Sequence, residues 1–238
     1  MIAAGRARRK TLSRIIALLE KDYGAPRRPR PGPLLDILIR TVLSQNTSDV
    51  NSDRAYRGLK MRFPAWGAVL GARRSAVERS IRCGGLAHTK AGHIQGVLRW
   101  LKRERGGLSL EWLRGMTVEE AVGALEGLSG IGLKTITVVL LFGCGADICP
   151  VDTHVHRLVR RIGLVEEKAG RNRTFWLLGE LVPRGKGISL HLNLIEHGRR
   201  VCKALRPRCA QCPILADCEY GLQRGRKRRP TGERRRTL

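Results

Sequence analysis

The sequence is poor in acidic and aromatic residues, and patterns that define several protein classes are missing from it. No apolar run approaches the ~18 residues that a membrane span requires, and no apolar segment follows the basic first ten residues as in a secretory signal peptide. Strand-like alternation of apolar and polar residues is scarce, and aromatic residues make up only 4% of the chain. These absences argue against a membrane or secreted protein, and they predict an all-α protein of the cytoplasm.

Length and positive charge dominate what remains. The chain has 238 residues, of which 42% are hydrophobic, enough for one large or two smaller domains with a buried core. It holds 46 Lys and Arg against 20 Asp and Glu, a net charge of +26. Residues 1–10 contribute +4 and residues 224–238 contribute +7, so the body between them carries +15. Charge spread in this way indicates a polyanionic partner such as nucleic acid, bound in a salt-dependent manner.

Apolar residues at helical spacing predict helices along most of the chain, separated by glycine and proline. The predicted helices are 12–22, 34–45, 49–63, 74–82, 89–104, 118–127, 133–143, 152–162, 172–182 and 189–203. Thr117 and Glu120 have the spacing of a capping box that opens the helix at 118–127. A Pro- and Arg-rich stretch at 25–33 is predicted to be a linker, and a disordered basic tail is predicted from about Arg224.

Four of the seven cysteines lie close together near the end of the chain. They have the spacing C-x6-C-x2-C-x5-C and are Cys202, Cys209, Cys212 and Cys218. Disulfides are a poor explanation in an intracellular chain, and four neighbouring thiolates repel one another unless they hold a cation. Only one C-x2-C pair of the zinc type is present, so the spacing favours a [4Fe–4S] cluster and leaves zinc as the alternative. The other cysteines, Cys83, Cys144 and Cys149, are expected to be inert.

A glycine-containing turn, Gly130-Ile131-Gly132, lies between two predicted helices. Glycine permits positive φ there and exposes N–H groups at a helix N-terminus, which suit one phosphate of a nucleic-acid backbone. Two nucleotide motifs do not fit. Thr135 replaces the third glycine of the dinucleotide fingerprint, and Leu133 displaces the P-loop lysine by one position.

Lys134 and Asp152 are the candidate reactive residues. Lys134 starts an apolar helix, where the positive end of the helix dipole favours a neutral, nucleophilic amine; a phosphate-binding cation is the alternative. Asp152 follows 18 residues later and is placed to cap the helix at 152–162. A lysine nucleophile and a carboxylate near a phosphate-binding turn suggest chemistry on a sugar.

Four motifs together resemble the endonuclease III family of DNA glycosylase/AP lyases over residues 12–222. They are the helix-hairpin-helix at 128–135, the Val151-Asp152-Thr153-His154 segment, His197-Gly198-Arg199 and the cysteine loop. The resemblance implies an all-α fold of two helical domains flanking a cleft. The six-helix barrel with the hairpin would be residues 33–146. The iron–sulfur domain would comprise 147–222 and the N-terminal arm and helix 1–32, with a basic tail at 223–238.

The resemblance also implies base excision repair. Lys134 would attack C1′ of a flipped nucleotide, displace an oxidised pyrimidine and form a Schiff base, after which β-elimination cuts the strand. Asp152 would stabilise the cationic sugar, and the cysteines would hold a structural [4Fe–4S] cluster. The expected partner is duplex DNA with a damaged base or abasic site, bound by a monomer associated with the nucleoid and not with a membrane. A monofunctional or mismatch-specific glycosylase and a non-catalytic DNA-binding module are the alternatives.

Further DNA contacts follow from the resemblance. Gly130 and Gly132 would bind a backbone phosphate. The segment 44–49 resembles the motif whose glutamine fills the gap left by the flipped base, and either Gln45 or Asn46 takes that position. Leu86 is the candidate for insertion between bases. The family's usual residue is absent at four positions, which leaves lesion preference open: Ala87, Ser129, Leu133 and Ile136.

Overall fold

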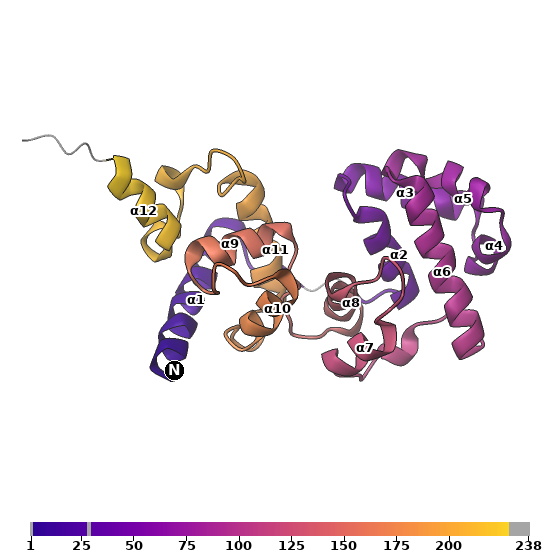
Figure 1. Cartoon of the computed structure of the whole chain (residues 1–238), viewed down its shortest axis with the longest axis horizontal. Helices are drawn as coiled ribbons and strands as arrows, with labels where there is room; N and C mark the ends of the chain where they lie inside the picture. The colour runs from indigo at the N-terminus through magenta and orange to yellow at the C-terminus, as the bar shows by residue number, and fades with distance from the viewer. Residues whose placement is uncertain (1, 28–29, 229–238) are drawn as a thin grey trace, which may run out of the picture. The chain divides into compact units, whose positions relative to one another are not determined.

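The computed structural model describes residues 2–27 and 30–228, and these form two compact units (Figure 1). One unit is Met1–Arg27 together with Asp147–Leu238, and the other is Arg28–Ala146. Every regular element of the described residues is helical and none is a strand, which confirms the all-α prediction. The predicted domains began at residues 33 and 147, whereas the units of the structure begin at 28 and 147.

The unit of residues 28–146 is built around one apolar helix, α2. This helix packs against α3, α6 and α8, and Leu38, Ile39 and Leu43 are among its buried side chains. An apolar surface on most faces of a helix requires neighbours on most sides, and the surrounding helices supply them. The helices are α2 (Leu34–Ser44), α3 (Asp49–Arg62), α4 (Trp66–Gly71), α5 (Arg74–Ile81), α6 (Ala87–Arg105), α7 (Val118–Leu125) and α8 (Leu133–Val139). Shorter turns are η1 (Arg82–Gly84), η2 (Glu111–Leu113) and the π-helical η3 (Leu140–Cys144).

The other unit is organised around α11, which packs on both α1 and α9. Leu190 and Leu194 of α11 are fully buried at this core. Its helices are α1 (Ile2–Tyr23), α9 (Thr153–Ile162), α10 (Arg171–Gly179), α11 (Gly187–Arg200) and α12 (Glu219–Arg228). Two 3-10 turns, η4 (Cys209–Gln211) and η5 (Leu215–Asp217), lie within the cysteine loop. Over the described ranges, no helix has the length and apolarity needed to cross a bilayer.

Both ends of the described chain differ from the predictions. Helix α1 begins at Ile2 and not near residue 12, because the alanines and basic residues of the arm are good helix formers that continue the helix across Gly5, and no proline interrupts it. Residues 224–228 belong to α12 and not to a disordered tail; the rest of the predicted tail, 229–238, lies outside the described residues. Helix α12 packs against α9, where the Arg161 guanidinium stacks 4.6 Å above the Tyr220 ring. Periodicity alone does not reveal such a tertiary contact.

The capping box predicted before helix 118–127 is confirmed. The Thr117 side chain accepts a hydrogen bond from the backbone N–H of Glu120 at 3.2 Å. In return, a carboxylate oxygen of Glu120 accepts from the backbone N–H of Thr117 at 2.8 Å. This reciprocal pair fixes the start of α7 and therefore the approach to the glycine turn.

Candidate active site

The glycine turn forms a tight hairpin between α7 and α8. Gly127 and Gly130 both have positive φ, at 91° and 80°, and the Ile131 N–H donates to the Leu128 carbonyl at 2.9 Å. Gly132 is the N-cap of α8 and is exposed. The first N–H groups of a helix lack partners within the helix. The hairpin therefore presents backbone donors to solvent at the helix N-terminus.

Two side chains of the same unit support this hairpin: His93, which the sequence did not indicate, and Gln45, which was predicted to contact DNA. Gly130 lies against His93 so closely that a Cβ at this position would be 2.6 Å from Cε1 of the imidazole. His93 Nδ1 is buried and has no hydrogen-bond partner in the described part of the chain. On the other side, Gln45 Nε2 donates to the Gly130 carbonyl at 3.0 Å and lies 3.4 Å from Thr135 Oγ1. In the sequence, only the glycine at position 130 indicated that another residue packs so closely against this turn, because glycine has no Cβ.

Lys134 is the second residue of α8, directly follows the hairpin in the sequence, and is half-buried. The residues that follow it, Thr135 to Leu141, are buried in the core, so the helix that carries Lys134 is held firmly. The Lys134 backbone lies in the first turn of α8, at the positive end of the helix dipole. The sequence prediction of where Lys134 lies relative to hairpin and helix agrees with the structure.

Asp152 belongs to the other unit and is the N-cap of α9. Its Oδ1 accepts a hydrogen bond from the Val155 N–H at 2.7 Å, so the predicted capping role is confirmed. Lys134 and Asp152 thus belong to different units, and each lies at the N-terminus of a helix, Lys134 in the first turn of α8 and Asp152 as the N-cap of α9.

The motif around His197 packs directly against the helix that Asp152 caps. A Cβ at Gly198 would lie 2.7 Å from Nδ1 of His154, so α9 and α11 approach here as closely as glycine allows. Arg157 donates to the Gly198 carbonyl at 3.1 Å and lies 3.1 Å from the His154 ring nitrogen. Burial lowers the pKa of His154 and lowers that of His197 to about 4, so burial favours the neutral form of both rings. Two motifs that are distant in sequence therefore form one packed layer.

The four clustered cysteines line a single small cavity of about 20 Å³. The pKa of the Cys212 thiol is raised to about 11, first by burial and also by the negative charge of the other three cysteines as thiolates. Among the described side chains, no three His, Cys, Asp or Glu are arranged to hold a metal ion. Four sulfurs that repel one another around one cavity are nevertheless the donor set that suits a cationic cluster larger than a single ion.

Two arginines of α9 attach the cysteine loop to the helix that begins at Asp152. Arg161 donates to Cys202 Sγ at 3.3 Å and to the Lys203 carbonyl at 2.8 Å. Arg157 donates to the Cys202 carbonyl at 3.0 Å. The two arginines are four residues apart on α9, so their side chains lie on the same face of the helix, toward the cysteine loop. The sequence alone did not indicate this role.

The remaining cysteines are separate from this cavity. Cys149 is buried, and burial raises the pKa of its thiol strongly, as expected for the inert thiol predicted from the sequence. Cys144 is half-buried with a pKa raised by burial, and Cys83 is exposed.

The two candidates for insertion into DNA share an unusual backbone conformation. Leu86 has φ 49° and is 58% exposed, and Asn46 is exposed with φ 52°. A positive φ is uncommon for a non-glycine residue and costs leucine more than asparagine, and such positions are concentrated at functional sites. Gln45, in contrast, uses its side chain to hold the hairpin. Gln45 and Asn46, which the sequence left open for the same role, thus differ in the structure: Gln45 is hydrogen-bonded to the hairpin, and Asn46 is exposed.

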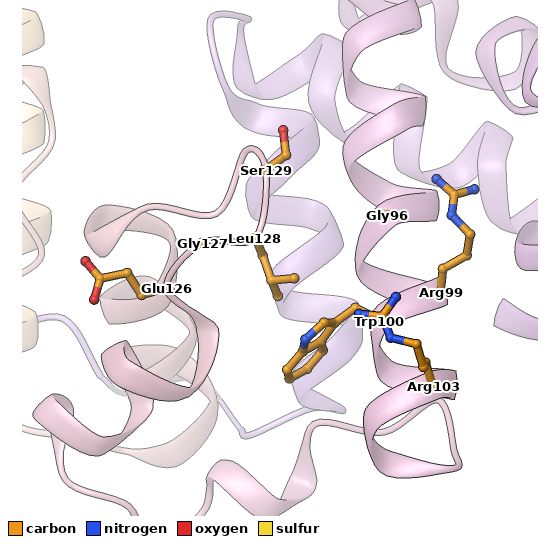
Figure 2. Close-up of a pocket in the computed structure, with 8 residues that line it drawn as sticks. All are labelled: Gly96, Arg99, Trp100, Arg103, Glu126, Gly127, Leu128 and Ser129. Carbon is orange, nitrogen blue, oxygen red and sulfur yellow. The ribbon is translucent and has the colours of Figure 1, made fainter.

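A basic groove of about 450 Å³ runs beside the hairpin in the same unit (Figure 2). Figure 2 shows Arg99, Trp100 and Arg103 projecting from α6, with Leu128 and Ser129 of the hairpin across from them. Two arginines one turn apart and one carboxylate, Glu126, line this groove, so its ionisable side chains have a net positive charge.

Comparison with known proteins places this fold and site in a family. Residues 39–184 match the HhH-GPD superfamily of base excision DNA repair proteins, and the chain belongs to that superfamily. Within it the chain is a relative of endonuclease III, and the resemblance drawn from the motifs is confirmed. Endonuclease III of Escherichia coli K12 is 33% identical over 185 residues, which are 78% of this chain and 83% of that protein. The Thermotoga maritima enzyme is 30% identical over 201 residues, 84% of this chain and 90% of its own.

A putative DNA glycosylase of Arabidopsis thaliana is more similar in sequence but longer. It is 41% identical over 178 residues, which are 75% of this chain and only 60% of that protein. Among solved structures, a non-covalent endonuclease III–DNA complex superposes with a TM-score of 0.78 at 25% identity, covering 92% of this chain and 98% of the other. These matches agree with a DNA glycosylase of base excision repair as the class of enzyme.

Proposed function

We propose that the protein is a bifunctional DNA glycosylase and AP lyase that removes oxidised pyrimidines from duplex DNA. The observation that carries this proposal is Lys134, which stands half-buried in the first turn of α8 immediately behind the hairpin. A phosphate bound at the hairpin N–H groups would bring the adjoining sugar toward this amine. A glycosylase that uses only activated water has no need for a primary amine at this position.

The proposed reaction proceeds through covalent catalysis. The neutral Nζ of Lys134 attacks C1′, the bond from C1′ to the base breaks, and the base leaves with the electron pair and takes up a proton. Ring opening gives a Schiff base between Nζ and C1′. Loss of a C2′ proton then expels the 3′ phosphate by β-elimination, and water hydrolyses the Schiff base to release the enzyme.

Asp152 is proposed to stabilise the positive charge that develops on the sugar as the base departs. Its Oδ1 is held by the Val155 N–H, which fixes the carboxylate without neutralising it. The remaining carboxylate oxygen would assist the proton transfers at the sugar.

Cys202, Cys209, Cys212 and Cys218 are proposed to hold a [4Fe–4S] cluster, which stabilises the loop when bound. The cavity that the four cysteines share, and the repulsion between their thiolate forms that a cation would relieve, support this assignment. Arg157 and Arg161 would hold the loop in register with α9, and through that helix with Asp152.

Contact with DNA is proposed along one surface of the 28–146 unit. Gly130 and Gly132 would hold a backbone phosphate, and the Arg99–Arg103 groove would neutralise neighbouring phosphates. Leu86 would enter the base stack, and Asn46 would occupy the space left by the flipped nucleotide because Gln45 is engaged with the hairpin.

Borohydride trapping tests the lyase step. We expect duplex DNA with thymine glycol or an abasic site to yield a covalent protein–DNA adduct, and Lys134→Ala to yield none. Lys168→Ala, which removes an exposed lysine of the other unit, serves as the matched control and should be trapped like the wild type. A wild-type protein that releases the damaged base without forming an adduct would refute the lyase activity and favour a monofunctional glycosylase.

A further inference from the structure

Lys90 is a lysine in the interior of the protein. Its side chain lies on α6, is only 2% exposed and ranks among the largest fully buried side chains of the described residues. It shares the buried face of α6 with Ile94, Leu98 and Leu101. Burying an ammonium group is unfavourable unless the surroundings satisfy it. Its contacts should therefore explain why a lysine occupies an apolar position.

The Lys90 ammonium joins two backbone segments that are distant in sequence. Nζ donates to the Leu43 carbonyl at 2.7 Å and to the Gly84 carbonyl at 2.8 Å. Leu43 lies in the last turn of α2, and Gly84 is the last residue of η1. Carbonyl groups at the C-terminal end of a helix lack partners and carry partial negative charge. Lys90 therefore supplies a positive donor at the ends of two helical segments.

Each of these carbonyls lies just before a residue that is proposed to enter DNA. Asn46 follows Leu43 by three residues, and Leu86 follows Gly84 by two. Both have positive φ, at 52° and 49°. A strained conformation persists only where neighbouring contacts hold it. The backbone N–H of Lys90 also donates to the Leu86 carbonyl at 2.9 Å, so Lys90 contacts the second loop twice.

We infer that Lys90 is a positioning residue for lesion recognition, which holds the Asn46 and Leu86 loops at a fixed spacing so that both enter the duplex together. This inference rests on the proposed function. One ammonium group is well suited to the role because it has three N–H donors, whereas an apolar side chain of the same length has none. The aliphatic stem packs in the core with its apolar neighbours, and only the terminal group serves the loops.

The same helix provides a matched control. Gln95 is 3% exposed, and its Nε2 donates to the carbonyls of Val69 and Ala72 at 3.0 and 2.9 Å. This amide thus makes two hydrogen bonds of the same kind, but to the C-terminal end of α4, which carries no proposed DNA contact. Lys90→Met and Gln95→Met each remove two buried hydrogen bonds while preserving most of the side-chain volume.

The experiment measures discrimination and not affinity alone. Fluorescence anisotropy would give the dissociation constants for a duplex with a tetrahydrofuran abasic analogue and for the matched undamaged duplex, at one salt concentration. A 2-aminopurine opposite the abasic analogue would report insertion into the stack. We expect Lys90→Met, which removes both hydrogen bonds, to reduce the ratio of the two constants about tenfold and to abolish most of the 2-aminopurine change.

Gln95→Met should keep the ratio and the 2-aminopurine signal within twofold of the wild type, although both variants should be less stable to heat. Equal losses of discrimination in the two variants would overturn the inference, because they would reflect general destabilisation of α6. If Lys90→Met does not fold, Lys90→Gln replaces it. Its amide stem is one atom shorter and reaches one carbonyl but not both, so an unchanged ratio would also overturn the inference. A wild type that does not prefer the abasic duplex would instead refute the proposed function itself.

Discussion

Replacing Gly130 by alanine should destabilise the protein through backbone strain and through overlap with His93. The same substitution at Gly127 and Gly132 allows the two effects to be measured separately. Gly130 has φ 80°, and a Cβ there would overlap the His93 imidazole. Gly127 has φ 91° but nothing within 4 Å of a Cβ, so it carries the backbone strain alone. Gly132 has φ −105° and equally open surroundings, so alanine meets neither obstacle there.

The magnitudes follow from these differences. A left-handed conformation costs an L-residue about 1–2 kcal/mol. Forcing extra volume into packed surroundings costs about 1–3 kcal/mol. Alanine also stabilises the folded state by about 0.4–1 kcal/mol through the lower entropy of the unfolded chain. We therefore expect a loss of about 1–4 kcal/mol for Gly130→Ala, about 0–1.5 kcal/mol for Gly127→Ala, and no loss for Gly132→Ala.

Urea unfolding of the full chain, followed by far-UV circular dichroism, would measure all three variants. A second test uses His93→Ala, which opens space beside the hairpin. Gly130→Ala should cost less in that background than in the wild type, because only the backbone strain remains. Equal stabilities of Gly130→Ala and Gly127→Ala, or strict additivity with His93→Ala, would show that His93 does not constrain the hairpin.

Three further predictions concern the helix termini and an internal ion pair. Asp152→Asn should keep the cap of α9 and near-normal stability while base release falls, whereas Asp152→Ala should lose both, the cap contributing about 1 kcal/mol. Thr117→Ala should lower the free energy of unfolding by about 1 kcal/mol through loss of the capping box, as seen in urea unfolding. Burial acts to raise the pKa of Glu20, but hydrogen bonds from Ser189 and Lys186 hold it below its usual value. Stability from Glu20 is therefore present above the ordinary carboxyl pKa and lost as the pH falls below it, so Glu20→Gln should flatten the acid side of a stability–pH profile.

Local patterns predicted those parts of the fold that local interactions determine. The capping box of Thr117 and the N-cap of Asp152 were predicted because their donors lie within a few residues. Helix α12 was missed because its sequence is polar and basic, and its helical state depends on packing against α9, more than 50 residues earlier in the chain. The short helix α4 was missed for a related reason, since six residues are too few to show a period.

The residues that support the candidate site are harder to find from sequence than the residues that perform chemistry. Lys134, Asp152 and the cysteines are recognisable because the reactive group itself is the signal. Lys90 has no such signal beyond a charged residue at an apolar position of α6, since its partners are main-chain carbonyls and one of them is 47 residues away. A lysine at such a position implies buried acceptors that the sequence does not identify. Every residue type has a backbone carbonyl, so the sequence does not mark Leu43 as an acceptor. Only the folded backbone shows that the Asn46 and Leu86 loops share one ammonium group.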